Sequence, residues 1–404
     1  MDARGAQPRP SSRRLKRVRV LFVTPSMPWP PDQGARIRSA ELIAALPPAV
    51  ELHLWWVARP GEPQLPEVLR ARCASVRRFE RSRPSLLERW AWPRAARWFW
   101  SRELGSALQD ALPPVDLVHL DEPSLLPHWP DRATAPVCLQ HHKLESVLAD
   151  SLADLAPDRA EAARQRLDAE RWRRLERDAA ARIPAQLVCA AEDAQRLRAA
   201  YPWLNPVVIE NGVTPERFAP RAVARGPHRL LLLGSLDYAP NQDGLRSFLQ
   251  ECWPGLRAAR PDLQLDIVGR GAAPELEAAC SFDPRIRWVG PVDDPRQHLA
   301  AAGAMVVPLR VGGGTRIKIA EALAMRTPVV STQIGAEGLD LRSGEHLRIA
   351  TLGEEFVSAT CAALDALPDD SITAAGHARV LERYTWRALA GRLAETWDVM
   401  SRSR

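Results

Sequence analysis

Short apolar runs recur through the first half of the chain, and stretches with helical periodicity separate them. Runs of this length with few charges are typical of strands that are buried on both faces of a parallel sheet. The predicted strands of this half span residues 18–24, 51–57, 116–121, 136–142, 186–190 and 206–213. A turn rich in proline and glycine follows the first run, and a helix begins near Arg36. This order of strand, turn and helix predicts a doubly wound α/β domain.

The second half repeats this alternation after residues 219–228, which are rich in proline, glycine and arginine and show no periodicity. Its predicted strands span residues 229–236, 263–271, 285–290, 304–308, 328–332 and 346–350, and its predicted helices span about 242–258, 274–280, 294–302, 316–325 and 354–366. The fold class is therefore α/β, with two Rossmann-like, doubly wound parallel-sheet domains that face a cleft. We expect an N-terminal domain at 18–218, a C-terminal domain at 229–375, and helices at 376–404 that can pack back on the N-terminal domain.

Composition and charge place the chain among globular proteins. Of its 404 residues, 46% are hydrophobic and 26% are charged. The formal net charge is +6, and residues 1–20 contain seven Arg or Lys and one Asp, so we interpret residues 1–17 as a disordered basic tail. No apolar run approaches the roughly 18 residues that span a bilayer, and the six scattered cysteines indicate buried free thiols. We therefore expect a cytoplasmic protein.

Three consecutive glycines, Gly312 to Gly314, stand between a predicted strand and the helix that follows it. Without side chains they let the backbone approach a ligand closely, and Thr315 is expected as the N-cap of the helix. Arg316 and Lys318 lie in the first turn, where they oppose the helix dipole unless an anion binds there. The pattern predicts a phosphate site, although a surface ion pair beside a flexible turn is the alternative.

Glycine also ends three other predicted strands of the second half: Gly234, which Ser235 follows, Gly269 and Gly290. Because parallel strands end at the same edge of a sheet, these positions are expected to converge on one deep cleft lined by backbone. Such a cleft suits a nucleotide.

Polar residues follow the strand ends of the first half. Gly34 and Arg36 lie after the first strand, and Asp121 and Glu122 end the strand at 116–121. His141 and His142 end the strand at 136–142, and Glu145 lies on the turn after them. We expect these groups to share general-base or sugar-hydroxyl binding roles at one sheet edge.

Eight arginines and four tryptophans (Trp90, Trp92, Trp98 and Trp100) are interleaved between Arg77 and Arg102. Such a segment can lie at a membrane interface or on stacked bases. The main alternative is an ordinary arginine-rich surface with its tryptophans in the core. We do not expect nucleic acid as a partner, because no recognisable binding module accompanies the basic residues.

The chain resembles the retaining glycosyltransferases of family 4, which are group 1 glycosyltransferases with the GT-B fold. The resemblance is carried by PPDQGARIR, DLVHLDEP, VIENGVTPERF, GSLDYAPNQDG, DIVGRG, WVGPVDD and, most specifically, GGGTRIKIAEALAMRTPVVSTQIGAEGL. It implies a nucleotide diphosphate sugar as donor, held by the C-terminal domain. It also implies a saccharide or lipid-linked acceptor, held by the N-terminal domain.

By position in the family motif, Glu321 corresponds to the glutamate that binds the ribose hydroxyls of the donor. Gly313 stands where the family commonly has a second glutamate, so the resemblance assigns donor-sugar contacts to the amides of Gly314 and Thr315. The usual Arg and Lys are absent from GSLDYAPNQDG, and we assign the diphosphate charge to Arg316 and Lys318 instead. Two further positions depart from the family pattern: Asp121 stands where many members place a histidine near the reacting sugar, and Glu210 replaces a common proline.

The resemblance implies a retaining, metal-independent hexosyltransferase that needs no cofactor. We expect it to act in surface polysaccharide or glycolipid synthesis, in the cytoplasm or at the periphery of the inner membrane. A nucleotide-sugar epimerase of the same fold is one alternative. A non-catalytic paralogue that binds nucleotide or scaffolds a synthesis complex is another.

Overall fold

The computed structural model describes residues 16–131, 135–223, 225–271 and 274–402, so most of the predicted basic tail at 1–17 lies outside the described residues. The N-terminal domain contains a parallel sheet of seven strands in the order β3-β2-β1-β4-β5-β6-β7. The strands are β1 Val18–Thr24, β2 Val50–Val57, β3 Cys73–Phe79, β4 Leu117–Leu120, β5 Val137–His141, β6 Gln186–Val188 and β7 Val207–Val208.

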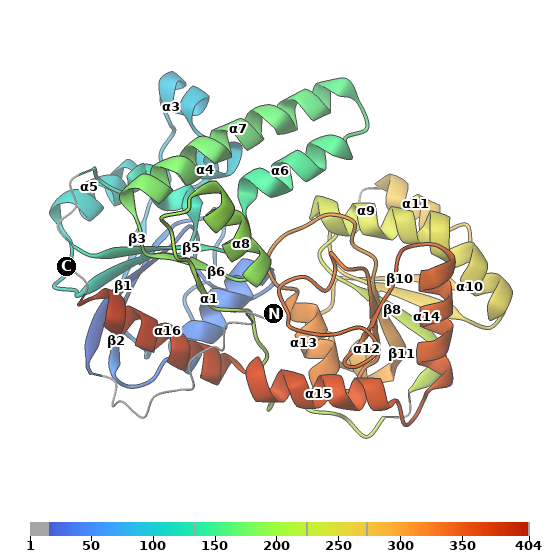
Figure 1. Ribbon diagram of the computed structural model, residues 1–404. Helices are drawn as coiled ribbons and strands as arrows, with labels where there is room; N and C mark the ends of the chain where they lie inside the picture. Colours follow the sequence, from blue (N-terminus) through green and yellow to red (C-terminus); the bar gives the residue numbers. More distant parts are fainter. Residues whose placement is uncertain (1–15, 132–134, 224, 272–273, 403–404) are drawn as a thin grey trace.

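Helices cover both faces of this sheet, as expected for strands that have apolar residues on both faces (Figure 1). They are α1 Gly34–Ala45, α2 Glu67–Arg70, α3 Leu86–Ala91, α4 Arg94–Trp98, α5 Arg102–Asp110, the 3₁₀ helix η1 Pro123–His128, α6 Glu145–Asp154, α7 Arg159–Arg182 and α8 Ala191–Ala200. Val20 and Phe22 of β1 pack with α1, whereas Leu21 and Val23 pack in the cluster that contains α5 and α7.

The C-terminal domain contains a second parallel sheet, of six strands in the order β10-β9-β8-β11-β12-β13. Its strands are β8 Gly226–Leu233, β9 Gln264–Val268, β10 Ile286–Gly290, β11 Ala302–Val307, β12 Val329–Ser331 and β13 Arg348–Ile349. Its helices are α9 Ala239–Ser247, the π-helix η2 Phe248–Cys252, α10 Trp253–Ala259, α11 Pro274–Cys280, α12 Arg296–Ala301, α13 Ile317–Ala324, α14 Glu354–Asp365 and α15 Ser371–Arg383. The predicted fold class, two doubly wound α/β domains, is confirmed.

The last helix, α16 Trp386–Met400, belongs to the N-terminal core, where Trp386, Leu393 and Trp397 are buried against α1 and β1. Helix α15 packs instead against α13 of the C-terminal domain, so the chain crosses between domains at Tyr384 and Thr385 (Figure 1). The other crossing lies beside it, because Val213 N donates to Tyr384 O at 2.8 Å. The two crossings therefore form one connection between the domains.

The strand β3 was not among the strands that the apolar runs predict. It is the edge strand of the N-terminal sheet, and Arg77 and Arg78 lie on its exposed positions. An edge strand has one side without a neighbouring strand and needs fewer apolar residues. The basic segment at residues 77–102 therefore begins within β3.

Candidate functional site

The glycines at the ends of β8, β9 and β10 lie side by side at the carboxyl edge of the C-terminal sheet. Gly234 N donates to Val268 O at 3.0 Å, and Gly269 N donates to Gly290 O at 2.9 Å. A Cβ on Gly269 would overlap the carbonyl group of Gly234, so only glycine lets these strand ends approach so closely. The structure therefore brings Gly234, Gly269 and Gly290 together as a wall of backbone.

Lys318 extends from the first turn of α13 to this wall. Its Nζ donates to Asn241 Oδ1 at 3.2 Å, and Asn241 Nδ2 donates to the carbonyl of Ser235 at 2.7 Å. A Cβ on Gly234 would lie 2.6 Å from Lys318 Nζ, so a side chain at this position would displace the ammonium group. Burial lowers the pKa of Lys318 to about 7, and the nearby charge of Arg316 acts in the same direction.

Arg316 is the N-cap residue of α13, and its guanidinium group turns back onto the glycine loop. Nη1 donates to Gly313 O at 2.5 Å and to Gly314 O at 3.0 Å. Its Nε and Nη2 are buried and have no hydrogen-bond partner among the residues that the structure describes. Burial also lowers the pKa of Arg316. Within the described part of the chain, neither Arg316 nor Lys318 has a carboxylate within 4.0 Å, and the charges of Glu337 and Asp193 on Arg316 and of Glu321 on Lys318 act from farther away.

Glu321 follows Lys318 by one turn of α13 and is partly buried. Burial raises the pKa of Glu321 to about 7, although the charges of Arg217 and Lys318 oppose this shift. The charge of Glu41, on α1 of the N-terminal domain, also raises that pKa. A partly buried carboxylate that accepts no hydrogen bond from the described residues is suited to accept bonds from ligand hydroxyl groups.

The glycine loop is in contact with the N-terminal domain. A Cβ on Gly313 would lie 3.0 Å from Cβ of Lys143, and one on Gly314 would overlap the carbonyl of His142. The prediction of Thr315 as N-cap is wrong, because its Oγ1 donates across the interface to Cys189 O at 2.6 Å. The N-cap residue is Arg316, and its side chain makes no capping hydrogen bond within the described chain. The two domains therefore close directly over the start of this helix.

Asp121 lies at the end of β4 and is buried, with both carboxylate oxygens engaged. Ser39 Oγ donates to Oδ2 at 2.5 Å, and His142 Nε2 lies 3.2 Å from Oδ1. Burial alone would raise the pKa of Asp121, but His142 and His119 together hold that pKa below its usual range. Asp121 thus supports His142, which is the more exposed of the two and lies nearer the glycine loop.

Lys143 is a site residue that the sequence analysis did not single out. Its Nζ pairs with Glu145 at 2.7 Å, and the charges of Glu145, Tyr238 and Glu122 outweigh burial and raise its pKa above the usual range. Burial, together with the charge of Glu145, raises the pKa of Glu122. Tyr238 belongs to the C-terminal domain, so Lys143 is a cation at the interface. Its place directly after His141 and His142 was the only signal in the sequence.

The structure does not bring every predicted acceptor residue to this edge. His141 is fully buried, with Nε2 at 2.9 Å from Gln186 Oε1, because adjacent residues of a strand point to opposite faces. Arg36 is buried and donates to Pro30 O at 3.2 Å and pairs with Asp32 at 2.8 Å. Asp32 pairs across the interface with Arg270 at 2.5 Å. Gly34 is the first residue of α1, with open space at its Cα.

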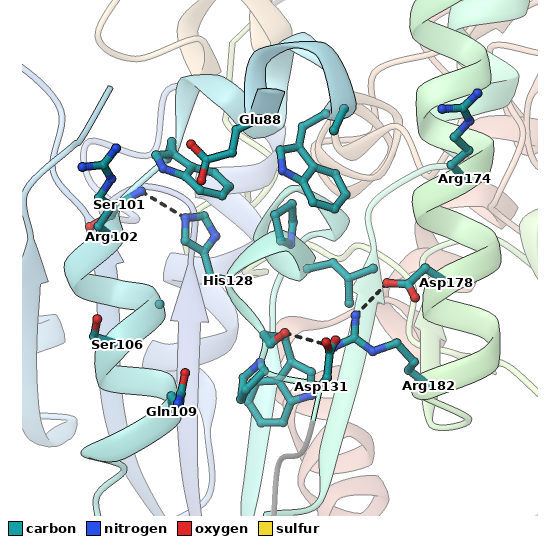
Figure 2. A pocket seen from close by; sticks show the side chains of 18 residues that line it. Glu88, Ser101, Arg102, Ser106, Gln109, His128, Asp131, Arg174, Asp178 and Arg182 are labelled. Atoms are coloured by element: carbon teal, nitrogen blue, oxygen red, sulfur yellow. Dashed lines mark hydrogen bonds and ion pairs between the residues drawn. The ribbon is translucent and has the colours of Figure 1, made fainter. Parts of the chain in front are cut away.

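A hollow of about 1230 Å³ lies elsewhere, in the N-terminal domain between α3, α5, η1 and α7. Figure 2 shows His128, Arg102 and Arg182 among the side chains that line it. None of the predicted site residues lines this hollow. The chemistry assembled at the glycine loop and the hollow are therefore separate features.

Known proteins resemble this chain in the domain that holds the glycine loop. Residues 227–366 match the family model described as Glycosyl transferases group 1. The resemblance to group 1 glycosyltransferases that the glycine-to-glutamate helix predicts is thereby confirmed. Over 211 residues the chain is 32% identical to a phosphatidyl-myo-inositol mannosyltransferase of Mycobacterium leprae, a match that covers 49% of this chain and 55% of that protein. The chain thus spans about half the length of the curated relatives it matches.

Solved structures confirm the GT-B fold. Anabaena Alr3699/HepE, solved in complex with UDP and glucose, superposes with a TM-score of 0.64 at 15% identity, over 95% of this chain and 100% of that one. Sucrose-phosphate synthase from Thermosynechococcus elongatus superposes with a TM-score of 0.70 at 18% identity, over 95% of this chain and 99% of that one.

Proposed function

We propose that the protein is a glycosyltransferase that takes a sugar from a nucleotide diphosphate sugar. The observation that carries this proposal is the pair of cations at the start of α13. Among the described residues, two buried nitrogen atoms of Arg316 have no acceptor, and Lys318, which donates to Asn241, has no carboxylate within 4.0 Å. A diphosphate would supply both the acceptors and the negative charge that these groups lack.

The rest of the donor has matching groups. The wall of Gly234, Gly269 and Gly290 offers backbone without side chains to a flat nucleoside. Glu321 is the group we propose for the ribose hydroxyls, and the amides of Gly314 and Thr315 for the sugar. The solved relatives in complex with UDP, UDP-glucose or UDP and glucose support this class of donor.

We propose a retaining, metal-independent transfer. The acceptor hydroxyl oxygen forms a bond to the anomeric carbon on the face from which the diphosphate leaves, and its proton passes to the departing phosphate oxygen. Arg316 and Lys318 would stabilise the charge that develops on the leaving group. His142, held by Asp121, and the ion pair of Lys143 and Glu145 stand on the acceptor side.

Since residues 142 and 143 lie directly against Gly313 and Gly314, donor entry requires the two domains to separate at this contact. The pairing of both chain crossings at Val213 and Tyr384 gives such a movement one place to occur. We propose a saccharide or lipid-linked acceptor in polysaccharide or glycolipid synthesis, which accords with the phosphatidyl-myo-inositol mannosyltransferases among the relatives. The enzyme would work in the cytoplasm, at the surface of the inner membrane. No helix in the part of the chain that the structure describes is long and apolar enough to cross a bilayer.

The experiment that tests the proposal is release of nucleoside diphosphate from a panel of uridine and guanosine diphosphate sugars without acceptor. Transferases of this kind leak slowly to water, so we expect slow release from at least one donor and its loss in Lys318→Ala. Binding of a nucleotide with no release from any donor would favour a non-catalytic paralogue. Interconversion of the sugar without release of the diphosphate would favour an epimerase.

A further inference from the structure

Helix α3 presents an apolar surface that the fold of its own domain does not use. Leu86, Leu87 and Trp90 are 78%, 83% and 77% exposed, and no residue of α3 is buried. The spacing of three and four residues puts these side chains on one side of the helix. Trp98 of the neighbouring α4 is also exposed, at 57%. We call these four residues the α3 surface.

The helix is nevertheless held in a fixed conformation. Ser85 and Glu88 form a capping box, in which Ser85 N donates to Glu88 Oε2 at 2.5 Å and Glu88 N donates to Ser85 Oγ at 3.3 Å. At its other end, Arg171 of α7 donates to Trp90 O at 3.1 Å and Arg97 donates to Arg89 O at 2.8 Å. The exposed apolar residues are therefore presented by a fastened helix and not by a loose loop.

A hollow lies on the inner side of α3. Glu88, which Figure 2 labels, and Ala91 line it together with Trp92 and Trp100. The four tryptophans of the basic segment are thus divided, with two facing the hollow and Trp90 and Trp98 facing outward. The alternative interpretation, in which the tryptophans pack in the core, therefore does not apply to Trp90 and Trp98.

The charge around the α3 surface has one sign. Residues 81–102 contain six arginines and a single acidic residue, Glu88, which the capping box occupies. Four of these arginines are exposed and have no carboxylate within 4.0 Å among the described residues: Arg83, Arg89, Arg94 and Arg102. The acidic residue next to them on α7, Asp168, accepts from Arg94 N at 3.1 Å and faces Arg171 at 3.8 Å.

From these observations we infer that the α3 surface docks the protein on an anionic lipid bilayer. Leucine and tryptophan side chains gain by leaving water for the interfacial region, and the surrounding arginines complement acidic headgroups. An apolar protein partner would cover the leucines and tryptophans but would not complement the charge of the four exposed arginines. Figure 1 shows α3 at the outer end of the N-terminal domain, the domain to which we assign the acceptor. The inference deepens the proposed function and rests on it for the lipid-linked acceptor.

The test is sedimentation of the full-length protein with vesicles of phosphatidylcholine alone and of phosphatidylcholine mixed with phosphatidylglycerol. We expect binding to the mixed vesicles that weakens with salt. The variant Leu86→Ser/Leu87→Ser/Trp90→Ser should lower it by about tenfold or more, and Arg83→Glu/Arg89→Glu should lower it similarly. Matched controls are Phe282→Ser, which is 90% exposed in the C-terminal domain, and Arg246→Glu on α9.

Equal binding by the α3 variants and the wild type would overturn the inference and assign any attraction to another part of the chain, such as the basic residues before Arg17. Self-association that depends on Leu86, Leu87 and Trp90, without vesicle binding, would overturn it in favour of a second copy of this chain. Nucleotide-induced thermal stabilisation of each variant shows that it is folded. Because vesicle binding requires no sugar transfer, its failure is distinguishable from failure of the proposed function.

Discussion

The ammonium group of Lys318 lies directly against Gly234, where a Cβ on residue 234 would approach Nζ to 2.6 Å. Lys318 belongs to the first turn of α13, and Gly234 directly follows β8. The contact therefore links the start of this helix to the end of that strand. The family motif places cations after the first strand of this domain. In this chain the cation arrives from α13 instead, and Gly234 leaves the space for it.

Replacing Gly234 by alanine should therefore displace Lys318. We expect Gly234→Ala to lower turnover on the order of tenfold or more and to cost about 1–3 kcal/mol of unfolding free energy, because neighbouring groups must shift. Steady-state kinetics and denaturant unfolding measure the two effects. Gly391→Ala is the control, since nothing lies within 4 Å of a Cβ at that position in α16. Unchanged turnover in Gly234→Ala would separate Lys318 from the site.

The pH dependence of nucleotide binding should report Lys318 directly. Burial lowers the pKa of this residue to about 7, so the free protein loses the charge as the pH rises above that value. A bound diphosphate favours the protonated form, and binding must then take up a proton. We expect the dissociation constant of a nucleoside diphosphate to rise by up to about tenfold per pH unit above pH 7. Calorimetric titration at several pH values between about 6.5 and 9 would measure this change in the dissociation constant.

The matched variant for this pH dependence is Lys318→Arg. A guanidinium group keeps its charge throughout that range, so affinity should become nearly independent of pH while part of the turnover is retained. Lys318→Ala should lose most of the turnover. A dependence as steep in Lys318→Arg as in the wild type would assign the titration to another group.

Glu321 should lower the stability of the free protein while it serves binding. Burial raises its pKa from 4.5 to about 7, so between these values the folded protein keeps a proton that the unfolded chain has lost. The free energy of unfolding therefore falls as the pH rises through this window. We expect Glu321→Gln to be more stable than the wild type at pH 8 by about 1–3 kcal/mol, and no more stable at about pH 4.

The same substitution should weaken donor binding about tenfold or more, because an amide is a weaker acceptor of two hydroxyl bonds than a carboxylate. Denaturant unfolding at both pH values and titration with a nucleoside diphosphate measure the two effects. Glu275→Gln on the exposed side of α11 is the control. A variant that binds the nucleotide as well as the wild type would remove Glu321 from the donor site.

Asp121 and His142 should behave as one unit. Asp121 is buried beneath the imidazole, and both of its oxygens are engaged by Ser39 and His142. We expect Asp121→Asn to lower turnover about tenfold through misplacement of His142, and we expect the double variant with His142→Ala to be no slower than His142→Ala alone. Kinetics of the four proteins measure this coupling. Independent, multiplicative effects would show that Asp121 acts without His142.

The sequence predicts most of the fold because most buried strands are largely apolar, as in β1 and β11. It does not predict β3, an edge strand in which the adjacent residues Arg77 and Arg78 are both exposed. Thr315 has the residue type of an N-cap, yet its hydroxyl group bonds Cys189, which is distant in sequence. The contact between the two domains, and not the local sequence, determines the hydrogen-bond partner of Thr315.

The local sequence likewise predicts some residues of the candidate site and misses one that depends on the other domain. Arg316 and Lys318 could be singled out because cations in a first helical turn contradict the helix dipole. The separation of His141 from His142 was available from the two-residue period of a strand, and only His142 reaches the edge. Lys143 had no such signal, since its importance comes from Gly313 in the other domain.

The most direct test of the account is a titration that compares a nucleoside, its monophosphate and its diphosphate on the wild type and on Arg316→Ala. If the unpaired nitrogens of Arg316 hold the diphosphate, the diphosphate binds much more tightly than the nucleoside, and Arg316→Ala loses most of that difference. Equal affinities for the three ligands, or a preference for the diphosphate that survives in Arg316→Ala, would contradict it.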